Sequence, residues 1–125
     1  MLELKPMNKE IYNNYIQNAI RQYAEEGAKS GRNIDFADAL KLANKEFNSL
    51  LPYGLKSKNQ FLYTIINDEN ENIGIMWFSS ESNHGDNEVF LCDIEIKKEF
   101  RGKGYGSESM NILELKIKEM NIFTI

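Results

Sequence analysis

The first half of the chain carries apolar residues at helical spacing in two stretches. The first stretch follows Asn8, which can cap a helix, and Gly27 and Gly31 are expected to close it. The second follows Asp35, another capping residue, and stops at Pro52. The apolar positions are Tyr12, Tyr15, Ile16, Ala19, Tyr23 and Ala24, then Phe36, Leu40, Ala43, Phe47 and Leu50. The pattern predicts a pair of amphipathic helices whose aromatic stripe packs in the core.

Strand patterns lie on both sides of this helix pair. A polar loop over 79–87 is predicted between the last two strands, and Gly74 indicates a bulge or a close backbone approach. The predicted strands are 2–5, 61–66, 73–78 and 88–96. The second and third of them read as an antiparallel hairpin.

The pattern returns to helical spacing after a charged, glycine-rich turn at 97–104. The apolar face of this last helix is predicted at Met110, Leu113, Ile117 and Met120, with Asn121 as its stop. A strand at 122–125 would pair in parallel with the strand before the turn, through a right-handed crossover. We therefore expect an α/β (α+β) fold with a mixed, mostly antiparallel sheet flanked by helices.

Composition limits the class of protein. The 125 residues are 42% hydrophobic and 27% charged, which is typical of one globular domain, expected over 1–125. No apolar run approaches the roughly 20 residues of a membrane span, and the N-terminus has no apolar signal core. We expect a cytoplasmic protein that does not act at a membrane.

The chain has a single cysteine, Cys92, and a single histidine, His84. One thiol cannot form an intramolecular disulfide, and a zinc site based on cysteine needs several thiolates. We predict no metal site. His84 is interpreted as a solvated residue of the polar loop.

The charge balance argues against general nucleic-acid binding. The net charge is −4, whereas nucleic-acid-binding proteins usually carry a basic stripe. One basic cluster stands out, with only Glu99 as an acidic residue inside it. Its members are Lys97, Lys98, Arg101 and Lys103. A basic spot on an acidic chain indicates a small polyanion as the ligand.

The turn at this basic cluster has the chemistry of a pyrophosphate site. Gly102, Gly104 and Gly106 permit positive φ and a close approach of the backbone to a ligand. The turn opens a helix, whose N-terminal N–H groups and partial positive charge favour anions. Arg101 and Lys103 add full positive charges. The Walker A pattern is absent, and the glycine spacing does not fit the dinucleotide-binding fingerprint.

Arg101-x-x-Gly104-x-Gly106 resembles the [QR]-x-x-G-x-[GA] signature of the GNAT superfamily of acyl-CoA-dependent N-acetyltransferases. The strand before the turn, the helix after it and the order of the earlier elements also resemble that family. The resemblance spans the whole chain. It implies that acetyl-CoA is the co-substrate and that a primary amine of a small molecule or peptide accepts the acetyl group.

The resemblance also implies roles for individual residues. The amides from Gly102 to Gly106, including Lys103 and Tyr105, would bind the coenzyme A pyrophosphate. The free backbone groups of Ile94 and Ile96 would bind the pantetheine arm, and the Ile94 N–H would polarise the thioester carbonyl. The amine would attack directly, with no covalent enzyme intermediate.

The general base is predicted among carboxylates of the strand that precedes the turn. Glu88 and Asp93 are the leading candidates, with Glu95 as a third. Strand alternation places Glu88 and Ile94 on one face, and Asp93 with Glu95 on the other, unless a bulge intervenes. Cys92 is interpreted as a small buried hydrophobe, because no cation is evident nearby to make it a thiolate.

Members of this family continue past the position of Ile125 into a helix and further strands. We therefore expect a truncated domain, or pairing of an exposed strand edge with a second copy to give a homodimer. Two alternatives to catalysis stay open. One is a non-catalytic coenzyme A binding module, and the other is a nucleotide or nucleic-acid binder that uses the basic cluster.

Overall fold

The computed structural model describes residues 2–29, 35–83 and 86–120. Its contacts divide the chain into two compact units, 1–7 with 58–125 and 8–57, and each unit is described by itself. The single domain expected from the sequence stays a prediction. Within the described residues, no helix combines the length and apolar character needed to cross a membrane.

The unit formed by residues 8–57 is the predicted helix pair. Helix α1 spans Lys9–Lys29 and helix α2 spans Phe36–Leu50, followed by a 3-10 turn at Gly54–Lys56. Both predicted caps are confirmed: Asn8 Oδ1 accepts from the Ile11 N–H at 2.8 Å, and Asp35 Oδ1 accepts from the Asp38 N–H at 2.8 Å. Each cap satisfies an N–H that the first helical turn leaves without a partner.

The two helices approach each other through small residues. Ala24, Ala39 and Ala43 form a buried cluster, and a side chain at Gly27 would lie 3.9 Å from the Ala39 methyl group. The prediction that Gly27 closes the first helix is wrong, because α1 continues through it to Lys29. Gly31 lies outside the described residues.

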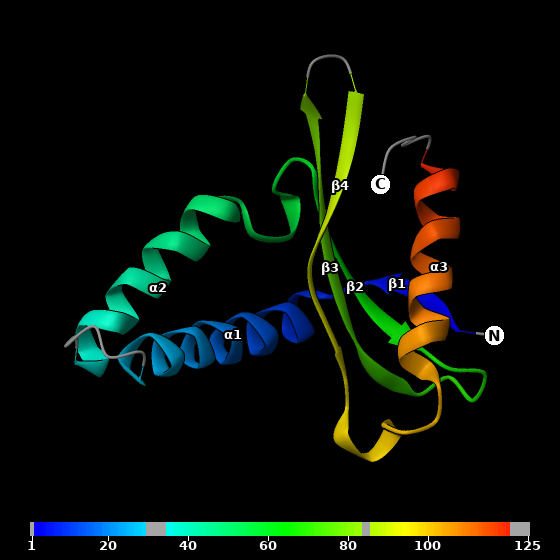
Figure 1. Ribbon diagram of the computed structural model, residues 1–125, viewed down its shortest axis with the longest axis horizontal. Helices are drawn as coiled ribbons and strands as arrows, with labels where there is room; N and C mark the ends of the chain where they lie inside the picture. The colour runs from blue at the N-terminus through cyan, green and yellow to red at the C-terminus, as the bar shows by residue number, and fades with distance from the viewer. Residues whose placement is uncertain (1, 30–34, 84–85, 121–125) are drawn as a thin grey trace. The chain divides into compact units, whose positions relative to one another are not determined.

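The other unit is built on an antiparallel sheet with the order β1-β2-β3-β4 (Figure 1). Each strand pairs with the one before it in the chain, so the sheet is a simple meander. The strands are β1 at Glu3–Pro6, β2 at Gln60–Ile66, β3 at Asn72–Asn83 and β4 at Asp86–Ile96. A 3-10 turn at Lys98–Phe100 then leads into helix α3 at Tyr105–Glu119.

The polar loop predicted over 79–87 is wrong. Strand β3 extends to Asn83 and β4 begins at Asp86, and their residues pair in register up to Asn83 opposite Asp86. Polar residues are tolerated here because a two-stranded ribbon satisfies its backbone groups without an apolar face. His84 lies outside the described residues.

A bulge in β4 changes which residues share a face. Trp77 pairs with Asp93 but the next residue, Phe78, pairs with Leu91, so Cys92 is the extra residue. The predicted burial of Cys92 is wrong: it is exposed, with its sulfur 3.7 Å from the Ser79 hydroxyl and from the Phe90 carbonyl oxygen. A bulge residue has no place in the regular alternation, so its side chain is not directed into the core.

Gly74 permits a close approach of β3 to β4, as the sequence indicated. A side chain at this position would collide with the carbonyl oxygen of Glu95 on β4. The predicted bulge is also present beside it, because Ile65 pairs with Gly74 whereas Ile66 pairs with Asn72. Glycine is therefore required here by space, since its φ is not in the left-handed region.

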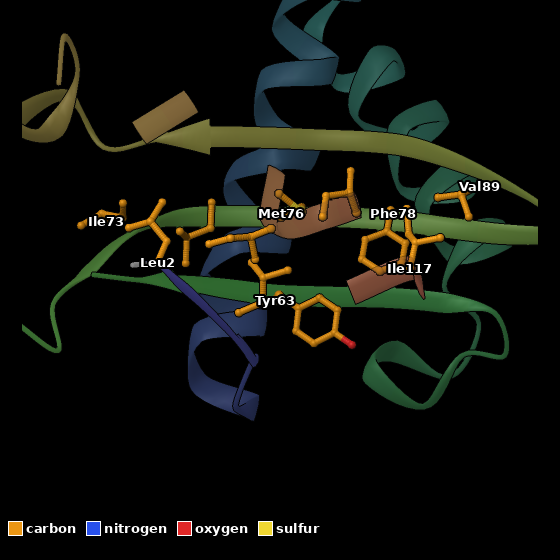
Figure 2. Close-up of a cluster of buried hydrophobic side chains, with 11 residues drawn as sticks. Leu2, Tyr63, Ile73, Met76, Phe78, Val89 and Ile117 are labelled. Atoms are coloured by element: carbon orange, nitrogen blue, oxygen red, sulfur yellow. The ribbon is translucent and has the colours of Figure 1, made fainter. Parts of the chain in front are cut away.

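The core of this unit lies between α3 and one face of the sheet (Figure 2). Phe78 has no exposed surface, and the centroid of its ring lies 5.0 Å from that of Phe61 and 5.8 Å from that of Tyr63 in stacked arrangements. Helix α3 buries Ser109, Ile112, Leu113 and Ile117. The predicted apolar face is thus right for Leu113 and Ile117 but wrong for Met110, which is exposed because the buried face is turned toward Ser109.

The predicted last strand, 122–125, and the helix stop at Asn121 lie outside the described residues. The parallel pairing expected of that strand therefore stays a prediction. Within the described residues β4 pairs on one side only, with β3.

Ser109 generates a stability prediction. Its hydroxyl is fully buried in α3 and has no hydrogen-bond partner among the described residues. A buried unpaired hydroxyl is destabilising, and alanine is also the better helix former. Ser109→Ala should raise the free energy of unfolding by about 1 kcal/mol, measured by urea denaturation.

Ser107→Ala, at an exposed position of the same helix, controls for helix propensity. A gain at Ser109 no larger than the gain at Ser107 would show that burial of the hydroxyl costs nothing.

Candidate functional site

A cavity of about 370 Å³ lies where β4 ends and α3 begins. Residues from the strand end, the 3-10 turn and the first turn of the helix surround it. They are Ile94, Glu95, Ile96, Phe100, Arg101, Gly102, Gly104, Tyr105 and Gly106. The strand end and the glycine-rich turn, singled out separately in the sequence, are thus brought to one place.

The end of β4 directs backbone groups away from the sheet. The Lys97 N–H donates to the Ile73 carbonyl oxygen at 2.8 Å, which fixes the hydrogen-bonding phase of the ladder. In an antiparallel ladder, alternate residues direct their N–H and C=O groups to the partner strand. Glu95 therefore faces β3, and the backbone groups of Ile94 and Ile96 point to the opposite edge. These are the groups that the sequence analysis assigned to ligand binding.

The turn after β4 is shaped by two glycines with left-handed backbones. Gly102 has φ +80° and Gly104 has φ +82°, and a Cβ at either position would meet no atom within 4 Å. Gly104 is also the N-cap residue of α3 and supplies no side-chain acceptor. The first N–H groups of α3 consequently have no side-chain cap, and they are favourable partners for an anion.

Gly106 differs from the other glycines of the turn. It lies in the first turn of α3, and its φ is not positive. The expectation that it provides a left-handed backbone is wrong. It is open space that distinguishes it, because a Cβ there would meet nothing within 4 Å.

Arg101 and Lys103, the two cations on either side of Gly102, are placed differently. Arg101 lines the cavity, and its Nε donates to the Ile96 carbonyl oxygen at 2.8 Å. The Lys103 side chain is not part of the cavity wall, and its Nζ lies 5.7 Å from the centroid of the Phe100 ring. Lys97 and Lys98 are exposed beside the turn.

The bulge at Cys92 brings both predicted base residues to the same face of the sheet. Asp93 is paired with Trp77 and Glu88 with Glu81, positions an even number of residues apart on β3. Ile94 packs against the core on the other face. Regular alternation would have separated Glu88 from Asp93, but the bulge that the sequence analysis left open is present, and its inserted residue reverses the alternation.

Glu95 has a perturbed acidity. Partial burial raises the pKa of its carboxyl, repulsion from the Asp93 carboxylate raises it further, and Arg101 opposes both. Phe100 and Glu95 are the cavity residues that the sequence analysis did not place there. Phe100 could not be predicted to line a ligand site, because an apolar residue in a turn has no feature that indicates ligand contact. Glu95 was predicted only as a possible general base.

Among the residues that the structure describes, no group of three or more His, Cys, Asp or Glu side chains could hold a metal ion. The chemistry of the cavity is that of backbone N–H groups, one arginine and nearby carboxylates. The backbone N–H groups and the arginine suit an anionic group such as a phosphate.

Known proteins resemble this chain over most of its length. Residues 16–125 match the profile of the acetyltransferase (GNAT) family. A Bacillus subtilis protein named uncharacterized N-acetyltransferase YycN is 31% identical over 119 residues, covering 95% of this chain and 76% of YycN. A second B. subtilis protein, named uncharacterized N-acetyltransferase YdgE, is 23% identical over 94% of this chain and 74% of YdgE.

Solved structures show the same architecture. The crystal structure of YycN superposes with a TM-score of 0.86 at 30% identity, covering 99% of this chain and 78% of that one. A predicted acetyltransferase from Clostridium acetobutylicum, crystallised with acetyl-CoA, gives a TM-score of 0.60 at 17% identity. It covers all of this chain and 79% of that one. At that identity the second likeness concerns the fold alone.

The acidity of Glu95 predicts a pH-dependent stability. A carboxyl with a higher pKa in the folded state binds more protons there, so the free energy of unfolding falls as pH rises through the interval above its usual value. Glu95→Gln should therefore be more stable than the parent at neutral pH, by less than about 1 kcal/mol because water screens the site.

The advantage should shrink as the pH approaches about 4, where the parent carboxyl is protonated too. Urea denaturation across this range measures it, and Glu114→Gln on the exposed side of α3 controls for the loss of one negative charge. An advantage independent of pH would contradict the assignment.

Proposed function

Because the chain belongs to the GNAT family of acetyltransferases, we propose that it transfers the acetyl group of acetyl-CoA to a primary amine of a small molecule or peptide. One observation carries the proposal. Outward-facing backbone groups of β4 and the uncapped N-terminus of α3 meet at a single cavity. Acetyl-CoA carries its thioester on an extended pantetheine arm that leads to a pyrophosphate, and it needs both kinds of partner.

The residues of the cavity fit acetyl-CoA. The amides from Gly102 to Gly106 lie at the start of α3, where the helix dipole favours the pyrophosphate. The space beside the three glycines is open, because a Cβ at any of them would meet no atom within 4 Å, and a ligand can approach the backbone there. The outward groups of Ile94 and Ile96 are then the partners for the amides of the pantetheine arm.

The transfer itself requires polarisation of a carbonyl and removal of a proton. The outward N–H of Ile94 is the donor proposed for the thioester oxygen, where negative charge develops as the amine attacks. The amine nitrogen forms the new bond to the acetyl carbon, and the bond from that carbon to sulfur breaks, so that coenzyme A leaves as its thiolate. Glu88 or Asp93 takes the proton that the attacking nitrogen releases.

The acceptor is proposed to be a cationic amine. Glu88, Asp93 and Glu95 share the face of β4 opposite the α3 core, so an amine bound along that face would meet negative charge. We also propose that the reaction takes place in the cytoplasm, as composition indicates.

Gly106 offers a test of the binding site that leaves backbone strain aside. Its φ is ordinary for a helix, so a larger side chain there fills the open space without forcing the turn. Acetyl-CoA at about 100 times its dissociation constant should stabilise the parent by roughly 2.7 kcal/mol, which is several degrees in Tm. Gly106→Val should abolish this shift.

Gly106→Ala should keep most of the shift, since a single methyl group reaches less far. Asn111→Val, at an exposed position of α3, controls for a β-branched residue in the helix. A full acetyl-CoA shift in Gly106→Val would place the ligand elsewhere. The absence of any shift in the parent would contradict the proposed function.

The two candidate bases predict a pH-dependent loss of activity. Replacement of the base by its amide removes the proton acceptor, which typically contributes 10²- to 10⁴-fold to the rate. Glu88→Gln or Asp93→Asn should lower kcat by about 100-fold or more, while the acetyl-CoA shift in Tm is unchanged. The measurement is release of free coenzyme A thiol with a panel of polyamines and basic peptides.

Raising the pH should recover activity in the variant that lacks the base, because the amine then deprotonates in solution and needs no proton acceptor. If both amides turn over like the parent, neither carboxylate is the base. Coenzyme binding without turnover by the parent on the whole panel would favour the non-catalytic binding module.

A further inference from the structure

The side chain of Arg101 closes the turn that follows β4. Its Nε donates to the carbonyl oxygen of Ile96, a residue five positions earlier, at 2.8 Å. The backbone hydrogen bonds within this turn join residues that are closer in sequence. The Phe100 N–H donates to the Lys97 carbonyl oxygen at 2.9 Å, and the Arg101 N–H donates to the Lys98 carbonyl oxygen at 3.3 Å. The side-chain bond therefore connects the last residue of the strand to the start of the glycine segment.

The acceptor of this bond is one of the outward-facing groups of β4. Because Ile96 directs its backbone groups away from β3, its carbonyl oxygen has no partner from the ladder. Arg101 supplies that partner. This bond occupies one of the two acceptor positions of the carbonyl oxygen, and the outward groups of Ile94 and the Ile96 N–H remain for a ligand.

The same bond sets the direction of the backbone entering the glycine turn. Arg101 is extended, with φ −73° and ψ 154°, and Gly102 follows at once with φ +80°. The reversal at this junction directs the N–H groups that precede α3. A side chain anchored on the strand fixes where the reversal starts, and so fixes the turn relative to the strand end.

We propose that Arg101 is a positioning residue, which acts through the hydrogen bond from its Nε to the Ile96 carbonyl and not mainly through its positive charge. This proposal rests on the proposed function, since the geometry it maintains is that of the acetyl-CoA site. The alternative is that Arg101 acts as a cation that attracts the pyrophosphate. In the proposal, the affinity for acetyl-CoA depends instead on the shape of the turn that Arg101 maintains.

The chemistry of glutamine makes the two readings separable. The amide nitrogen of glutamine stands the same number of bonds from Cα as the Nε of arginine, and it also donates. Glutamine therefore retains the donor and loses the charge. Lysine retains the charge but places a methylene group where Nε stands, and methionine has neither the donor nor the charge.

The experiment measures acetyl-CoA affinity by calorimetry for the full chain and for Arg101→Gln, Arg101→Lys and Arg101→Met. Lys118→Gln, an exposed cation in the last turn of α3, controls for the loss of one positive charge. If Arg101 acts by positioning, the Arg101→Gln variant should bind acetyl-CoA with an affinity within about threefold of the parent. The Arg101→Lys and Arg101→Met variants should bind it about five- to tenfold more weakly. Far-ultraviolet circular dichroism checks that each variant is folded.

The opposite order would overturn the inference: Lys binding like the parent, with Gln as weak as Met, would show that the charge is what matters. Equal binding by all variants would overturn it as well. Hydrogen exchange of the turn amides over 97–104, without ligand, tests positioning independently of any coenzyme. Exchange should be faster in Arg101→Met than in Arg101→Gln, and equal rates would contradict the proposal. Failure of the parent to bind acetyl-CoA would refute the proposed function, while this exchange comparison would still decide the role of Arg101.

Discussion

The pairing of β4 with β3 is the constraint on which the candidate site depends. An antiparallel ladder commits alternate backbone groups to the partner strand and leaves the others outward. The bond from Lys97 to Ile73 sets the phase, and Gly74 is where β3 can approach the Glu95 carbonyl without a clash. The outward groups of Ile94 and Ile96 follow from this phase. A shift by one residue would turn them toward β3 and remove the site.

The same strand carries an irregularity that places the acidic side chains. The extra residue at Cys92 reverses the alternation, so Val89 and Ile94 both belong to the α3 core and Glu88 joins Asp93 on the other face. Core packing therefore holds the carboxylates in place, although none of them is itself part of the core. Beyond the strand end, Arg101 links the last outward carbonyl to the turn, which joins the two halves of the cavity.

The sequence predicted the parts of the fold that depend on residues close together in the chain. The caps at Asn8 and Asp35, the helix pair and the glycine-rich turn before α3 depend on neighbouring residues, and the sequence indicated all of them. The bulge, the exposure of Cys92 and the length of the β3–β4 ribbon depend on pairing between strands. No glycine or other local signal marks the bulge at Cys92, and serine and glutamate on a two-stranded ribbon resemble a loop. The hydrogen bond from Arg101 to the Ile96 carbonyl could not be predicted from the sequence either. A positive charge in the sequence indicates an anionic ligand, but it does not indicate which backbone group the arginine Nε will contact.

The central claim is that acetyl-CoA binds along the outward edge of β4 and at the start of α3. The most direct measurement is an amide NMR titration of the 125-residue chain with acetyl-CoA. The account predicts large shifts for Ile94 and for 102–106, with a smaller shift at Glu95, whose N–H faces β3. Shifts confined to other parts of the chain, or equal shifts at Ile94 and Glu95, would contradict it.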